Sequence, residues 1–108
     1  MDEREFMAAA DAELARLQTA LEVASESGVA DFDVETKPGG VIEIEFDNGS
    51  KIILNRHGAA QEIWLAAKSG GYHFRPTGGR WLGTRDGEEL LAALSRTLSE
   101  QAGHTVVL

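Results

Sequence analysis

The sequence contains no cysteine. This absence excludes structural disulfides, a thiol nucleophile and thiolate ligands for zinc or for an iron–sulfur cluster, because each of these needs a cysteine sulfur. No apolar run approaches the length that spans a membrane, and the first five residues are acidic where a secretory signal would be basic and then apolar. We therefore expect a cytoplasmic protein without a membrane partner.

Sequence motifs of the common enzyme classes are also absent. There is no Walker loop, dinucleotide fingerprint, nucleophile elbow or HExxH pair, and the paired glycines at 70–71 and 78–79 lack the strand-to-helix context that phosphate binding needs. The histidines His57, His73 and His104 lie far apart, and none has a metal-ligand partner at helical spacing. We interpret each as a lone surface histidine, and we expect a protein that is not an enzyme.

Positive charge is scarce in the first part of the chain. Residues 1–48 hold 13 Asp and Glu against three Lys and Arg, whereas residues 49–108 hold five against seven, so the net charge of −8 is divided unevenly. An acidic surface repels nucleic acid and anionic lipid, and it attracts cations or a basic patch on another protein. The alternative explanation is that the negative charge only keeps the protein soluble, but solubility does not require the charge to be concentrated in one part of the chain.

The first amphipathic segment covers residues 3–26. Apolar residues recur there at spacings of three and four, which is typical of one face of a helix, and Gly28 is a stop signal. Asp11, Glu22 and Glu26 project from roughly the opposite side, so we expect them to face solvent. The apolar residues are Phe6, Ala10, Leu14, Leu17, Leu21 and Ala24.

Six short β-type runs follow, separated by turns rich in glycine. They cover residues 31–36, 41–46, 52–56, 62–66, 72–75 and 80–82. Asp86 and Glu89 then have the spacing of a capping box, which predicts the start of a second amphipathic helix that closes at Gly103.

This order of elements predicts an α+β fold with two layers. Both helices pack on one face of a six-stranded, mostly antiparallel sheet. A chain of 108 residues is long enough for one compact core, so we expect a single domain over residues 1–108. The other face of the sheet meets solvent, and we expect it to carry some of Asn55, Arg56 and Trp64.

Three acidic residues alternate with apolar ones in the first strand. Asp31, Asp33 and Glu35 share its outer face, about 7 Å apart, while Phe32 and Val34 point to the core. Carboxylate oxygens suit iron, manganese, calcium or magnesium better than copper or zinc. Because these carboxylates lie on an exposed strand and not in a shaped cavity, we expect them to bind such a metal ion weakly and unselectively. The alternative is a merely solvated face, and the spacing alone does not decide.

The middle of the chain resembles bacterial members of the frataxin family. The resemblance rests on residues 48–56, 63–66 and 70–74, and it extends in one register from Phe6 to the start of the second helix at 86–88. It implies the frataxin fold, with two helices on a curved antiparallel sheet. It also implies an iron-binding accessory protein of iron–sulfur cluster assembly, which donates iron to the cysteine desulfurase complex, regulates it, or does both.

The resemblance further implies where iron binds. In frataxins the iron-binding surface is an acidic ridge from the end of the first helix through the first strand, and it holds Fe²⁺ or Fe³⁺ weakly. Family members usually carry more acids late in this helix, where this chain has Gln18, Thr19 and Val23. The residues that correspond to the ridge and its surroundings are Asp31, Asp33, Glu35, Glu22, Glu26 and Asp11.

The implied partners are the cysteine desulfurase and the iron–sulfur scaffold complex. In the family, the ridge meets a basic patch on the desulfurase, and the sheet surface around a tryptophan is a second contact. A chain without cysteine leaves the scaffold role to another protein. We expect a monomer, or an oligomer that depends on iron. The implied partner-binding residues are Asp31, Asp33, Asn55, Arg56 and Trp64.

Three alternatives stay open. A ferroxidase that stores iron on oligomerisation would need carboxylates that converge on a pair of irons. A haem-binding protein would use His57, His73 or His104 as a ligand. A partner module that acts by charge alone would need no metal.

Overall fold

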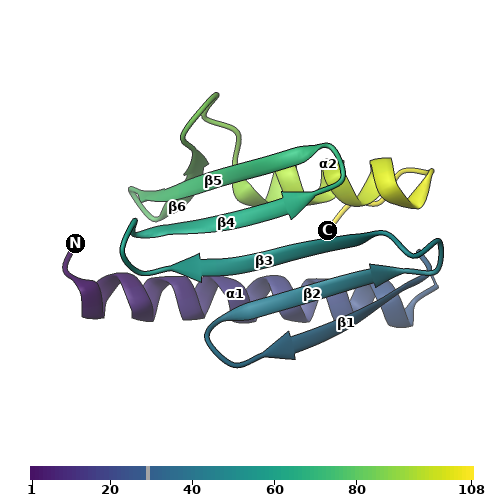
Figure 1. Cartoon of the computed structure of the whole chain (residues 1–108), viewed down its shortest axis with the longest axis horizontal. Helices are drawn as coiled ribbons and strands as arrows, with labels where there is room; N and C mark the ends of the chain where they lie inside the picture. The colour runs from purple at the N-terminus through teal and green to yellow at the C-terminus, as the bar shows by residue number, and fades with distance from the viewer. Residues whose placement is uncertain (29) are drawn as a thin grey trace.

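The computed structural model describes residues 1–28 and 30–108. Within them, the described strands form one sheet in the order β1-β2-β3-β4-β5-β6, and each strand is antiparallel to its neighbours. Both helices lie on the same side of this sheet (Figure 1), so the two-layer α+β fold is confirmed. The elements are α1 (Glu3–Glu26), β1 (Phe32–Lys37), β2 (Val41–Phe46), β3 (Lys51–His57), β4 (Glu62–Ala67), β5 (Gly70–Thr77), β6 (Arg80–Gly83) and α2 (Leu90–Ala102).

Helix α1 has a capping box at its start. The Asp2 carboxylate accepts a hydrogen bond from the Glu5 backbone at 2.7 Å, and the Glu5 carboxylate accepts one from the Asp2 backbone at 3.4 Å. The helix ends at Glu26, and Gly28 follows with a φ of 76°, in the left-handed region that favours glycine. Neither helix of the described residues is long and apolar enough to cross a membrane.

Helix α2 begins without the capping box that the sequence predicts. Its N-cap is Glu89, whose side chain makes no capping hydrogen bond and is ion-paired with Arg80 of β6. Asp86 instead accepts a hydrogen bond from the Glu88 backbone within the preceding loop, at 3.1 Å. The capping-box prediction is therefore wrong, although the helix closes at Gly103 as expected.

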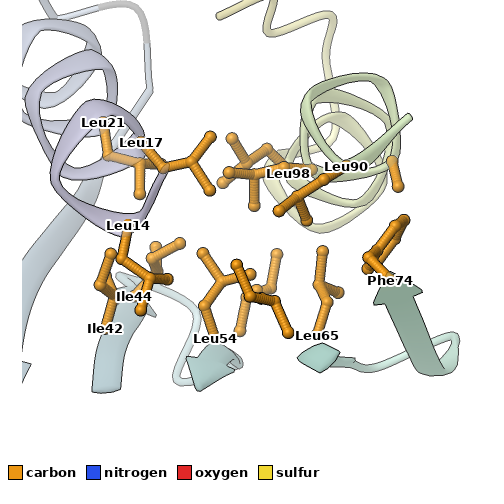
Figure 2. Packing of buried hydrophobic residues seen from close by; sticks show 14 of the residues in the cluster. Leu14, Leu17, Leu21, Ile42, Ile44, Leu54, Leu65, Phe74, Leu90 and Leu98 are labelled. Atoms are coloured by element: carbon orange, nitrogen blue, oxygen red, sulfur yellow. The ribbon is translucent and has the colours of Figure 1, made fainter. Parts of the chain in front are cut away.

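The core lies between the two helices and the inner face of the sheet. Figure 2 shows Leu14, Leu17 and Leu21 of α1 beside Leu90 and Leu98 of α2, above the aliphatic side chains of the strands. Alternate strand residues point inward, which leaves the intervening ones on the opposite side, hereafter the open face. The buried strand residues include Phe32, Ile42, Ile44, Phe46, Ile52, Leu54, Ile63, Leu65 and Phe74.

Candidate functional site

The pairing of β1 with β2 places carboxylates opposite one another on the open face. Asp33 lies directly across from Glu45, and Glu35 lies across from Glu43. Asp31 precedes β1, and its backbone oxygen accepts a hydrogen bond from Asp47 at 3.2 Å. We call this the acidic surface; it consists of Asp31, Asp33, Glu35, Glu43, Glu45 and Asp47.

Part of the acidic surface is hollowed. The carboxylate residues Asp31, Asp33, Glu45 and Asp47 line a shallow depression at the end of the β1–β2 ladder. Glu45 and Asp47 are absent from the sequence-based set of site residues, as is Glu43. Their alternation with Ile44 and Phe46 indicated the outer face, but only the β1–β2 register brings them against Asp33 and Glu35.

Two lysines neutralise one member of the acidic surface. Glu43 accepts hydrogen bonds from Lys37 Nζ at 2.7 Å and from Lys51 Nζ at 2.9 Å. These two hydrogen bonds lower the pKa of Glu43 to about 2, and the bond from Lys37 contributes the most. The same bonds raise the pKa of Lys37 and of Lys51. Glu43 is therefore held as an anion with two resident counter-ions.

The end of α1 is fastened to the start of β1. Ser25 Oγ donates a hydrogen bond to the backbone oxygen of Phe32 at 2.7 Å. Glu22 and Glu26 are exposed on the last turns of this helix, as the sequence predicts. Within residues 1–28 and 30–108, no group of three or more Asp, Glu and His converges closely enough to hold a metal ion. The acids line an open surface.

Asp11 is exposed, as the sequence predicts, but it forms an ion pair with Arg56, and this contact corrects the expected positions of Arg56 on the open face and of Asp11 near the acidic surface. Arg56 follows the inward-facing Leu54 by two residues and lies across from the buried Ile63, so it is on the helix side of the sheet. Asp11 lies 11 residues before Glu22, about 16 Å along the helix axis. The structure therefore separates Arg56 from the open face, and Asp11 from the acidic surface.

The open face carries a second feature, formed by β3, β4 and β5. Trp64 is stacked between His57, at 3.9 Å between ring centroids and 12° between planes, and His73, at 4.4 Å and 9°. We call these three residues the ring column. Asn55 lies beside it, directly across from Trp64. The interpretation of His57 and His73 as lone surface histidines is therefore wrong, because the strand register brings both against one indole.

A buried carboxylate supports the ring column. Glu62 is only 4% exposed. It accepts hydrogen bonds from Trp64 Nε1 and from Arg75 Nε, both at 2.8 Å, and it lies 3.4 Å from His73 Nδ1. Burial raises the pKa of Glu62, but these hydrogen bonds outweigh burial and hold the pKa below its usual value. The tryptophan is thus fixed by polar and stacking contacts together.

Comparison with known proteins gives a consistent result. The family model described as a frataxin-like domain matches residues 1–104. A protein of Dechloromonas aromatica named iron-sulfur cluster assembly protein CyaY is 53% identical over 108 residues, which cover 100% of this chain and 99% of that protein. A protein of the same name from Janthinobacterium sp. is 53% identical over 110 residues, covering 100% and 96%.

Solved structures are similar as well. Frataxin from Psychromonas ingrahamii superposes with a TM-score of 0.80 at 32% identity, covering 99% of this chain and 97% of that one. Trimeric frataxin from the yeast Saccharomyces cerevisiae, complexed with ferrous, superposes with a TM-score of 0.76 at 29% identity, covering 88% and 86%.

Proposed function

The chain belongs to the frataxin family, and on that premise we propose that it is an iron-binding accessory protein of iron–sulfur cluster assembly. In this role it donates iron to the cysteine desulfurase complex, regulates that complex, or does both. It acts in the cytoplasm by binding and not by catalysis. The names of its relatives support the pathway, and the yeast relative complexed with ferrous supports the metal.

The observation that carries the proposal is the paired arrangement of the acidic surface. Asp33, Glu35 and Glu45 are exposed and lie on facing strands, so a cation at this surface meets carboxylates from both. Oxygen ligands of this kind suit ferrous and ferric iron. An open surface releases its ion easily, which fits a protein that passes iron on. Glu22 and Glu26, exposed on the last turns of α1, add negative charge near this surface, because Ser25 of the same helix is hydrogen-bonded to the start of β1.

The same charges suit a basic partner. We propose that Asp31 and Asp33 meet a basic patch on the cysteine desulfurase, because complementary charge steers association. Asn55 and Trp64 on the open face form the second contact, with the scaffold complex. Arg56 faces α1, so its effect on partners is indirect, through the strand that carries Asn55. The absence of cysteine leaves the nascent cluster to the scaffold protein.

The test replaces Asp31, Asp33 and Glu35 with lysine in one variant. Ferrous binding is measured by anaerobic calorimetry, and desulfurase binding by biolayer interferometry. Both affinities should fall at least tenfold, because three attractive charges become repulsive. Unchanged affinity for both would reject the proposal.

The matched control carries the same charge reversal at three acids elsewhere, namely Glu3, Asp86 and Glu100. Its net charge equals that of the test variant, so a general loss of negative charge affects both proteins alike. The control should retain most of its iron affinity. If it loses as much as the test variant, total charge and not the acidic surface determines binding.

A further inference from the structure

The turn between β2 and β3 carries a pair of residues that can react with each other. Asn48 and Gly49 are adjacent in this turn, and both are exposed. In such a pair the next backbone nitrogen can attack the side-chain amide, because glycine has no side chain to block the approach. Whether the pair reacts therefore depends on how the fold holds these atoms.

The reaction is a deamidation that needs only water as a co-reactant. The Gly49 nitrogen gives up its proton and bonds to Cγ of Asn48, the bond from Cγ to Nδ2 breaks, and ammonia leaves. Water then opens the resulting cyclic imide at either of its carbonyls. One opening gives aspartate at position 48, and the other gives isoaspartate, in which the main chain runs through Cγ. Nothing is oxidised or reduced.

The turn holds each of the reacting groups in a hydrogen bond. The Gly49 N–H donates to the Phe46 backbone oxygen at 2.9 Å, so the attacking nitrogen is engaged. Nδ2 of Asn48, the leaving group, donates to the backbone oxygen of Gln101 at 3.0 Å. Oδ1 of Asn48 accepts from Ser50, from the backbone N–H at 2.9 Å and from Oγ at 2.7 Å. Attack on Cγ requires this arrangement to open.

Gln101 fastens the turn to the end of α2, which lies at the same end of the molecule (Figure 1). Its side chain is only 8% exposed. Nε2 donates to Ser50 Oγ at 3.0 Å and to the Lys51 backbone oxygen at 3.2 Å, and Oε1 accepts from the Lys68 backbone at 2.9 Å. Separating a buried amide from such partners is costly, because each group would be left unpaired. The Gln101 contacts therefore keep the turn closed.

Deamidation would also remove a contact that the end of α2 needs. The backbone oxygen of Gln101 is among the last carbonyls of the helix, which have no partner within it. Asn48 supplies a donor to this oxygen. Aspartate at position 48 has no such donor when ionised, and it would place a negative charge at the negative end of the helix dipole. The modified turn therefore cannot close on α2 as before.

We propose that Asn48 is a deamidation site and that the Gln101 side chain restrains its reaction in the folded protein. The restraint acts on local opening of the turn, a motion that does not require the whole chain to unfold. Removing the Gln101 contacts should therefore speed the reaction in a protein that is otherwise folded. Neither iron nor a partner takes part, so the proposal does not depend on the function proposed above.

The experiment incubates the whole protein at pH 8 and 37 °C and follows deamidation by mass spectrometry of its peptides. Asn48 of the folded wild type should react about tenfold more slowly than Asn48 of the same protein held unfolded in guanidinium chloride. Q101A keeps the backbone oxygen but loses the side-chain bonds, so its folded form should react about fivefold faster than the folded wild type.

The chain contains an internal control for the chemistry. Asn55 is its other asparagine, and the residue that follows is arginine, whose side chain hinders the attack. Asn55 should therefore react far more slowly than Asn48 in the unfolded protein. Equal rates at the two asparagines would show that the pair with Gly49 is not a preferred site.

I63V is the control for a general loss of stability. Ile63 is buried near the start of β4, whereas Lys68, whose backbone contacts Gln101, follows the end of that strand. The substitution removes a buried methyl group and so destabilises the whole fold. It should leave the rate at Asn48 almost unchanged. If I63V speeds the reaction as much as Q101A does, unfolding of the whole chain is the route, and the role of Gln101 is rejected.

Three further results would overturn the proposal. If Asn48 stays intact in the unfolded protein, it is not a deamidation site. If the folded wild type reacts as fast as the unfolded chain, the hydrogen bonds of the turn do not restrain the reaction. If folded Q101A reacts no faster than the folded wild type, the restraint does not come from Gln101.

A second measurement uses wild-type protein only, so it does not depend on the folding of a variant. Hydrogen exchange of the Gly49 amide, followed by NMR, reports how often the attacking nitrogen is released from its hydrogen bond. The protection of this amide should match the factor by which folding slows the deamidation of Asn48. An unprotected Gly49 amide would contradict the proposed restraint.

Discussion

Asp33 and Glu45 lie directly opposite each other across the antiparallel β1–β2 ladder, and both side chains are exposed on the open face. Like charges at directly opposed positions destabilise a sheet. The neighbouring pair, Glu35 and Glu43, is also acidic, but two lysines compensate Glu43. The protein thus keeps negative charge here at a cost in stability, which a surface selected for binding explains better than solubility does.

Removing one charge of this pair should stabilise the fold. We expect D33N to raise the free energy of unfolding by about 0.5 kcal/mol at low salt, because it relieves this repulsion. E45Q relieves the same repulsion but also removes the attraction between Glu45 and Lys51, its cross-strand neighbour in β3, so it should gain less. Urea unfolding measures the effect. The gain should shrink at 0.5 M salt, where screening weakens exposed charges. The double variant should gain less than the sum of the two, and a strictly additive result would show that the pair does not interact.

The lowered pKa of Glu43 predicts an acid-sensitive contribution to stability. Because the pKa falls from 4.5 to about 2 on folding, the ion pairs contribute fully above about pH 4.5. Their contribution is lost as the pH falls toward 2. The stability difference between the wild type and E43Q should therefore be largest above pH 4.5 and should vanish near pH 2. Urea midpoints across this range measure it, and a difference that is independent of pH would contradict the assignment.

Gly40 should tolerate alanine less well than its neighbour Gly39. Both have a left-handed φ, 75° and 90°, so alanine costs about 1 kcal/mol of strain at either position. At Gly40 the added Cβ would also lie 2.7 Å from Cγ of Arg56, whereas at Gly39 it meets nothing within 4 Å. We expect G40A to be the more destabilising of the two in urea unfolding.

Repeating both substitutions in an R56A background separates strain from contact. With the Arg56 stem removed, G40A and G39A should cost similar amounts, because only the backbone strain is left. If G40A stays more costly there, its extra effect does not come from Arg56.

Local patterns in the sequence predicted much of the fold. The apolar period of three and four placed α1 at its observed bounds, and the alternation in 41–46 did the same for β2. Alternation also applies to Asn55 and Arg56, which are adjacent in a strand and so must face opposite sides. Alternation alone therefore shows that the two cannot share the open face, and the structure places only Asn55 there.

The ring column could not be predicted in this way. His57, Trp64 and His73 meet only because of the registers between β3, β4 and β5, and those registers depend on how the intervening turns fold. The Asp11–Arg56 ion pair spans 45 positions and depends on how α1 crosses the sheet. The pairing of the acids across β1 and β2 is intermediate in how well the sequence predicts it, because the register of these two strands depends on a single hairpin turn.

Lys51 should limit how tightly the acidic surface binds a cation. Its ammonium donates to Glu43, and the residue is paired across the β2–β3 ladder with Glu45, so a positive charge already lies beside these carboxylates. We expect K51M to tighten binding of Mn²⁺, a probe that resists oxidation, several-fold in calorimetry. K68M removes an equal charge from the turn between β4 and β5, away from the acidic surface, and should change the affinity less than twofold. Equal effects of the two substitutions would mean that net charge alone governs affinity; a larger effect of K51M would identify Lys51 as a resident competitor that keeps binding weak.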